Sequence, residues 1–180
     1  MDRQFTVWMN GFAGRNALLD WAMIAITRYG VPLIVIIVAL HWWQRRDRSH
    51  VRHVVVRSGL AFLLGLAANQ VILFFVHRIR PYDAGVTLLM VARSADWSFP
   101  SDHATASIAV VVAFTGQRLP GKLAVLATLA TLICLSRVYV GLHYASDVLA
   151  GAAIGALAAG CVALVYREGS RLDKFVTGLL

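Results

Sequence analysis

The sequence predicts an α-helical membrane protein that crosses the bilayer several times, and three observations carry this prediction. Hydrophobic residues make up 59% of the 180 residues and charged residues only 14%, against roughly 45–50% and about 25% in ordinary globular chains. The mean hydropathy is +0.69. Apolar runs such as 54–76 and 123–140 are close to the length of about 20 residues that crosses a hydrocarbon core. We expect 1–180 to form a single integral-membrane domain.

The N-terminal part is expected to hold an interfacial segment and one broken helix. Residues 2–12 alternate polar and apolar positions, so we place the segment 1–15 at the membrane interface. This segment lacks the basic, apolar and small-residue pattern of a cleaved signal, so we expect it to belong to the mature protein. The apolar stretch 17–43 contains Gly30 and Pro32. Since proline removes a backbone donor, we predict a break there, between a short first helix and a spanning second helix.

Basic residues gather in three separate segments between the apolar spans, namely 44–57, 117–122 and 167–174. Arginine and lysine accumulate in cytoplasmic loops, so all three segments are expected on the cytoplasmic side. This orientation fixes the direction of the later spans, which are 54–76, 103–116, 123–139 and 144–166. It makes 77–102 an extracytoplasmic loop, and it places the polar residues of 77–103 and 136–147 together on that face.

The formal net charge of +8 does not indicate nucleic acid as a partner. The basic residues lie between apolar spans and do not interleave with aromatic residues on a polar face. The expected partner is the lipid bilayer. The sequence leaves the oligomeric state open, including a homo-oligomer.

Seven polar residues are expected on the extracytoplasmic face: Arg80, Ser101, Asp102, His103, Arg137, His143 and Asp147. Ionisable residues at membrane depth are costly and point to function. His143 and Asp147 are four positions apart, so on a helix they would share one face and touch. A carboxylate that accepts from one imidazole nitrogen fixes the tautomer and leaves the other nitrogen free as a nucleophile or base.

The remaining residues of this set suit a phosphate group. Arg80 and Arg137 can present paired donors to phosphate oxygens. Ser101 precedes an apolar helix as an N-cap, and a helix N-terminus binds anions. His103 in the first turn could protonate a leaving oxygen. We therefore predict phosphoryl transfer through a histidine nucleophile, with no metal and no cofactor, because the four nearby aspartates form no cluster that would hold Mg²⁺.

Three segments resemble the signatures of the type 2 phosphatidic-acid phosphatase superfamily: Arg80-Pro81, Pro100-Ser101-Asp102-His103, and Ser136-Arg137 followed by His143 and Asp147. The resemblance implies a six-helix bundle that hydrolyses phosphate esters and anhydrides through a phosphohistidine. It implies that His143 is the nucleophile, that Asp147 orients it, and that His103 is the general acid. Arg80, Ser101 and Arg137 match the family's phosphate ligands.

The sequence departs from the family pattern at two positions. Leu73 stands where the family has a lysine seven residues before the arginine of Arg-Pro, and Asp102 replaces a glycine. Both departures, together with the segment 10–14, are similar to the bacterial undecaprenyl-diphosphate phosphatase branch. Arg78 is a candidate substitute for the lysine, against the alternative of an interfacial arginine. Because Asp102 would repel a phosphate, we expect its side chain to point away from the pocket or to cap the helix.

Two further features have a structural and a functional interpretation. Asn69 would either make an interhelical hydrogen bond, which we favour, or support the pocket from behind. The small-residue stripe 151–155 is expected to pack helices within one chain. The loop 82–98 contains an apolar patch, 86–92, that either covers the pocket or enters the bilayer.

The sequence thus predicts a lipid phosphatase of the bacterial plasma (inner) membrane with its active site on the extracytoplasmic face. The expected substrate is undecaprenyl diphosphate, hydrolysed to undecaprenyl phosphate and inorganic phosphate. The alternative is another lipid phosphate, such as phosphatidylglycerophosphate or phosphatidic acid. A minor alternative is a transporter of anions or lipids.

Overall fold

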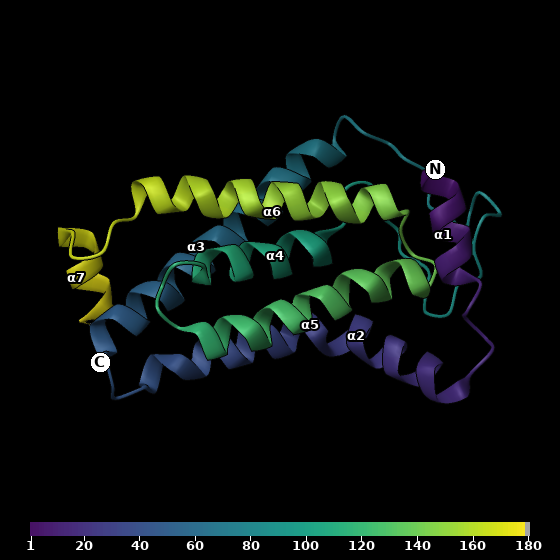
Figure 1. Cartoon of the computed structure of the whole chain (residues 1–180). Coiled ribbons are helices and arrows are strands. Elements are labelled where there is room, and N and C mark those ends of the chain that lie inside the picture. The colour runs from purple at the N-terminus through teal and green to yellow at the C-terminus, as the bar shows by residue number, and fades with distance from the viewer. Residues whose placement is uncertain (179–180) are drawn as a thin grey trace.

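The computed structural model describes residues 1–178, which contain helices and no strands (Figure 1). The α-helices are α1 (Asp2–Asn10), α2 (Ala17–Leu40), α3 (Arg48–Leu73), α4 (Asp102–Phe114), α5 (Pro120–Tyr139), α6 (Ala145–Val165) and α7 (Arg171–Thr177), with a short 3-10 helix, η1 (His41–Trp43), after α2. Within this part of the chain, α2 with η1, α3, α5 and α6 are long and apolar enough to cross a membrane, and α4 is shorter. The all-α polytopic prediction is confirmed, but the number of helices differs from the predicted six.

Helix α4 lies at the centre of the bundle and packs against α2, α3, α5 and α6 (Figure 1). The short helices α1 and α7 cover opposite ends. The long segment 74–101 and the turn 140–144 lie at the same end as α1, which we call the α1 end. Helix α4 is shorter than its neighbours, and segment 74–101 leads into its first residue at this end.

The predicted break in the first apolar stretch is wrong. Helix α2 runs without interruption through Pro32. Membrane helices tolerate an internal proline because neighbouring helices and side chains compensate for the lost backbone bond. Gly30 has a packing role, since a Cβ atom there would lie 2.5 Å from Cγ1 of Ile133 on α5. This glycine therefore allows α2 and α5 to approach closely.

Two glycines of the stripe 151–155 bring α6 against α4. A Cβ atom at Gly151 would lie 2.5 Å from the backbone oxygen of Ser101, and one at Gly155 would lie 2.3 Å from that of Thr105. These contacts confirm the predicted packing within one chain. They also fix the start of α4 beside the start of α6, where the polar signature residues lie.

Gly155→Ala is expected to destabilise the bundle by about 1–3 kcal/mol or more, because the obstacle is backbone rather than a flexible side chain. Gly160→Ala, in the same helix, is the matched control, since its added Cβ would meet no atom of another segment within 4 Å in the described part of the chain. Thermal unfolding in detergent should show a lower midpoint for Gly155→Ala and an equal or higher one for Gly160→Ala. Equal midpoints for Gly155→Ala and the unmodified chain would contradict this packing.

The three basic segments meet at the α7 end, as the sequence predicts. The ring nitrogens of His50 lie 2.9 Å from Oε1 of Glu168 and 2.8 Å from the backbone oxygen of Gln117. Lys122 donates to Gln44. The segments that precede α3, precede α5 and follow α6 are therefore joined by hydrogen bonds.

The predicted loop 44–57 is shorter in the structure, because α3 already begins at Arg48. The helix extends this far because the His53 side chain is buried against α7, with its Nδ1 2.9 Å from Oδ1 of Asp173. The hydroxyl of Tyr166 donates to the same oxygen at 2.7 Å. This polar cluster fastens α7 to α3 and α6, so the charged stretch folds as helix instead of loop.

Candidate active site

A polar pocket of about 140 Å³ lies at the α1 end of the bundle. Its lining residues come from segment 73–103 and from 137–143: Leu73, Arg80, Ser94, Asp96, Trp97, Pro100, Asp102, His103, Arg137 and His143. Both predicted histidines and both predicted arginines therefore meet around one hollow. The fold brings them together because α4 and α6 start side by side and α5 ends there.

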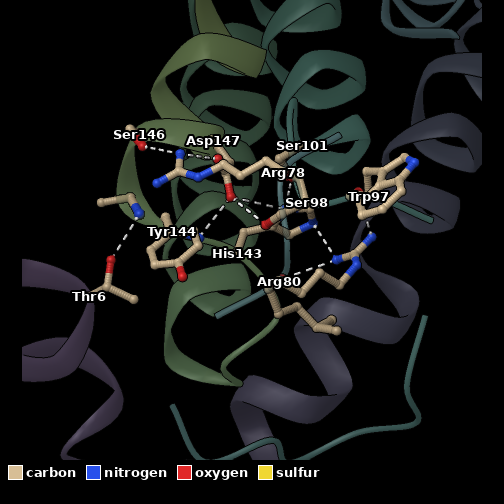
Figure 2. A network of polar contacts seen from close by, with 12 residues as sticks. Thr6, Arg78, Arg80, Trp97, Ser98, Ser101, His143, Tyr144, Ser146 and Asp147 are labelled. Carbon is tan, nitrogen blue, oxygen red and sulfur yellow. Dashed lines mark hydrogen bonds and ion pairs between the residues drawn. The ribbon is translucent and has the colours of Figure 1, made fainter. Parts of the chain in front are cut away.

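The His143 side chain is held in one tautomer between two fixed partners (Figure 2). Its Nδ1 lies 2.7 Å from the backbone oxygen of Ser98, and its Nε2 lies 3.4 Å from Nη1 of Arg80. A carbonyl only accepts and a guanidinium only donates, so Nδ1 carries the proton and Nε2 presents its lone pair. Burial lowers the pKa of His143 to about 4. The imidazole is therefore neutral at neutral pH.

Asp147 lies behind His143 and does not hydrogen-bond to it, since Oδ2 is 3.8 Å from Nδ1. The expected contact is present at ion-pair distance but not as a hydrogen bond, because His143 belongs to the turn before α6 and not to the helix itself. Oδ2 of Asp147 instead accepts from the backbone N–H of Tyr144 at 2.9 Å and from the hydroxyl of Ser98 at 2.6 Å. Ser98 thus positions both residues, through its carbonyl and its hydroxyl, and the sequence alone did not reveal this role.

The guanidinium of Arg80 is held rigidly by the pocket wall. Besides His143, its acceptors are the backbone oxygens of Asp96 (2.8 Å), Leu142 (3.0 Å) and Trp97 (3.2 Å) and the hydroxyl of Ser94 (3.1 Å). Burial lowers the pKa of Arg80, although an arginine side chain stays protonated at neutral pH. The structure therefore places a fixed positive charge beside Nε2 of His143.

Arg137 is buried, and part of its guanidinium is unpaired. Nη1 donates to Oγ1 of Thr27 at 2.9 Å, and Ser136 donates to the same oxygen at 3.1 Å. Nε of Arg137 and Oγ of Ser101 are buried without a hydrogen-bond partner in the described part of the chain. Ser101 is the predicted N-cap of α4, but its side chain makes no capping bond. The Nε group of Arg137, a residue that lines the pocket, and the hydroxyl of Ser101, which does not line it, thus have unused hydrogen-bonding capacity.

Asn69 of α3 makes the predicted interhelical hydrogen bond, and its partners lie on α4. Nδ2 of Asn69 lies 2.6 Å from Oδ1 of Asp102 and 2.9 Å from Oγ1 of Thr105. The favoured interhelical hydrogen bond of Asn69 is therefore confirmed. Asp102 neither caps α4 nor leaves the pocket, because it is bound by Asn69 while still lining the hollow. Leu73, at the position of the family lysine, adds an apolar surface there.

Of the predicted phosphate ligands, Arg80 and Arg137 line the pocket, whereas Ser101 and Arg78 do not. Nη1 of Arg78 lies 2.6 Å from Oδ1 of Asp147 and 2.6 Å from Oγ of Ser146, and its Nη2 lies 2.7 Å from Oδ2 of Asp2. The side chain therefore lies on the far side of Asp147 (Figure 2). No feature of the sequence indicated that Asp2 would be part of this network.

The loop 82–98 packs against the bundle and forms one wall of the pocket. Its apolar patch contacts the turn after α5, where the N–H of Met90 donates to the backbone oxygen of Val140 at 3.1 Å. Asn10 of α1 accepts from the N–H of Leu88 at 2.7 Å and donates to its oxygen at 2.9 Å. The patch is therefore held by α1 and α5, and the following residues reach Arg80.

Comparison with known proteins agrees with the site. The model of the PAP2 superfamily matches residues 54–171. The chain is 31% identical over 170 residues to undecaprenyl-diphosphatase BcrC of Bacillus subtilis (strain 168), covering 93% of this chain and 84% of that protein. It is 31% identical over 158 residues to phosphatidylglycerophosphatase B of the same organism, covering 79% and 73%.

Solved structures share the fold. The crystal structure of a transmembrane PAP2 type phosphatidylglycerolphosphate phosphatase from Bacillus subtilis superposes with a TM-score of 0.71 at 27% identity, over 94% of this chain and 86% of that one. Aquifex aeolicus LpxE has the same fold, with a TM-score of 0.71 at 23% identity, over 91% and 94%. The chain therefore belongs to the PAP2 superfamily and is a hydrolase of phosphate esters or anhydrides.

Proposed function

We propose that this protein removes the terminal phosphate of undecaprenyl diphosphate through a phosphohistidine on His143. The main support for this chemistry is the neutral imidazole of His143, whose Nε2 faces the Arg80 guanidinium at the pocket. Similarity to an undecaprenyl-diphosphatase over 93% of the chain supports the substrate. The products are undecaprenyl phosphate and inorganic phosphate.

In the first step, Nε2 of His143 attacks the terminal phosphorus, and the bond from phosphorus to the bridging oxygen breaks. Negative charge on the equatorial oxygens is stabilised by fixed donors, which is the main source of catalysis in phosphoryl transfer. Arg80 supplies one guanidinium, and Arg137 and Ser101 supply the unpaired donors. His103, which lines the same pocket, protonates the departing oxygen of the lipid phosphate.

In the second step, water attacks the phosphorus of the phosphohistidine, and the bond to Nε2 breaks. His103 has lost its proton in the first step, so it can accept one from the water. The phosphorylated imidazole carries a positive charge, which the carboxylate of Asp147 stabilises from 3.8 Å. Inorganic phosphate leaves, and the neutral His143 is restored.

The proposed location is the bacterial plasma membrane, with the pocket opening toward the extracytoplasmic side. The three basic segments lie together at the opposite, α7 end, which favours the cytoplasm for that end. Helix α4 has 13 residues, or about 20 Å. A site at its first turn would therefore lie below the membrane surface, within reach of a lipid headgroup.

Phosphatidylglycerophosphate is the second candidate substrate. The supporting observations are the 31% identity to phosphatidylglycerophosphatase B and the superposition on a phosphatase of that type. The chemistry would be the same, with a phosphate monoester in place of the anhydride. The transporter alternative is not favoured, because the two relatives at 31% identity that cover most of this chain are both named as phosphatases.

The test is a comparison of lipid substrates with the purified full chain in detergent. Undecaprenyl diphosphate, phosphatidylglycerophosphate and phosphatidic acid are presented at equal mole fractions in mixed micelles with EDTA, and released phosphate is measured. We expect the highest kcat/KM for undecaprenyl diphosphate. A higher kcat/KM for phosphatidylglycerophosphate would make that lipid the preferred substrate in place of undecaprenyl diphosphate. Loss of activity with EDTA would show that a metal takes part.

A further inference from the structure

The carboxylate of Asp147 is held from the side away from the pocket. Its Oδ2 has two partners, Ser98 and Tyr144, whereas Oδ1 receives its hydrogen bond from Arg78 at 2.6 Å. The Asp147 side chain is completely buried, and its carboxylate forms an ion pair with Arg78. A buried carboxylate that loses such a partner is strongly destabilised in its charged form.

Arg78 is itself fixed by α1. Oδ2 of Asp2 accepts from Nη2 of Arg78 at 2.7 Å, and the guanidinium lies 4.0 Å above the ring of Tyr144. Burial alone would raise the pKa of Asp2, but hydrogen bonds from Ser146 and Arg78 hold it below its ordinary value. Asp2 and Asp147 therefore bind different nitrogens of the same guanidinium, Nη2 and Nη1.

Helix α1 also supplies hydrogen-bond acceptors to the N-terminus of α6, which begins two residues before Asp147. Oδ1 of Asp2 accepts from the N–H of Ser146 at 2.9 Å, and Oγ1 of Thr6 accepts from the N–H of Ala145 at 3.1 Å. The first N–H groups of a helix have no partner within it and need outside acceptors. Here a separate helix supplies these acceptors, so the position of α1 determines the local geometry around Asp147.

We infer that Arg78 and Asp2 are positioning residues that fix Asp147 relative to His143. Through Asp2, helix α1 therefore contributes to the geometry of the active site. Arg78 is not one of the residues that line the pocket, and its guanidinium is held by Asp2, Ser146 and Asp147. Its effect passes through the orientation and charge of Asp147, which stabilise the phosphorylated imidazole. This inference rests on the proposed phosphohistidine chemistry, and it replaces the prediction that Arg78 binds phosphate.

The kinetic test separates positioning from substrate binding. Arg78→Gln is expected to lower kcat for undecaprenyl diphosphate by about 10- to 100-fold, the size of effect that a small displacement of a catalytic group produces. KM should change by less than about twofold, since no contact with substrate is lost. Arg78→Lys keeps the charge and should restore part of kcat.

A double-mutant cycle tests whether Asp2 acts through Arg78. Asp2→Asn alone should lower kcat in the same direction, and in the Arg78→Gln background it should cause no further loss of kcat. Arg93→Gln is the matched control, since Arg93 lies in the same loop and forms an exposed ion pair with Asp83 at 3.0 Å. Its kinetics should equal those of the unmodified chain.

Three outcomes would overturn the inference: a raised KM with unchanged kcat in Arg78→Gln, unchanged kinetics, or additive losses in the double variant. Size-exclusion profiles and unfolding midpoints are recorded for every variant. If Arg78→Gln does not fold, Arg78→Lys and Asp2→Asn still decide, because a normal kcat in both variants would contradict the inference. An unmodified chain that releases phosphate from none of the lipids would refute the proposed function instead.

Discussion

His143→Ala is expected to reduce phosphate release from undecaprenyl diphosphate by about 10⁴-fold or more, the size of loss seen when an enzyme's nucleophile is removed. No other side chain presents an unprotonated nitrogen to Arg80 at the pocket, within the described part of the chain. Arg80 and Arg137 would still bind phosphate, so binding should persist while turnover is lost. Steady-state phosphate release and substrate binding to micelle-embedded protein would measure the two effects.

The control for this variant is His41→Ala, because His41 lies in η1 near the other end of the bundle and bonds to the backbone of its own segment. Its activity should match that of the unmodified chain. Both variants should keep an unfolding midpoint near that of the unmodified protein. Substantial turnover by folded His143→Ala would remove His143 from the nucleophile role.

Arg137→Lys is expected to lower kcat/KM by about 10²- to 10³-fold, the effect of losing one preorganised donor in a transition state. The guanidinium of Arg137, a residue that lines the pocket, donates one N–H to Thr27, and its Nε has no hydrogen-bond partner among the described residues. Lysine carries the same charge on a single nitrogen, so it cannot bond Thr27 and the phosphate with the same planar fork. The measurement is kcat/KM for undecaprenyl diphosphate at several substrate mole fractions.

Arg28→Lys is a suitable comparison, because Arg28 is the neighbour of Thr27 on α2 and its side chain is exposed. That variant should retain full kcat/KM. Thr27→Val should lower kcat/KM less than Arg137→Lys does, because it removes the support and keeps the guanidinium. An Arg137→Lys enzyme with unchanged kcat/KM would show that charge alone suffices at this position.

Much of the fold could be predicted from the sequence because long apolar spans separated by basic segments constrain a membrane protein strongly. The prediction failed where tertiary packing decides local structure. Pro32 did not end α2, since the neighbouring α5 accommodates a continuous helix beside Gly30. Residues 48–53 joined α3 because His53 is buried against α7. Neither partner is close in sequence.

The pocket residues could be predicted because their side chains carry the chemistry and their spacing is characteristic. Their supports could not be predicted, because several are backbone carbonyls of the 94–98 segment, whose function does not depend on residue type. The orientation of the Arg78 side chain could not be predicted from the sequence either. It depends on the acceptors that Asp2 supplies from the first turn of the chain.

Chemical trapping of the phosphorylated enzyme tests the mechanism most directly. Undecaprenyl diphosphate labelled at the terminal phosphate is mixed with excess enzyme, quenched in alkali during a single turnover, and digested for mass spectrometry. The mechanism predicts label on the peptide that contains His143, bonded to Nε2 of that residue, in an amount that rises and then falls as phosphate appears. Label on a different residue, or phosphate release with no labelled protein at any time, would contradict it.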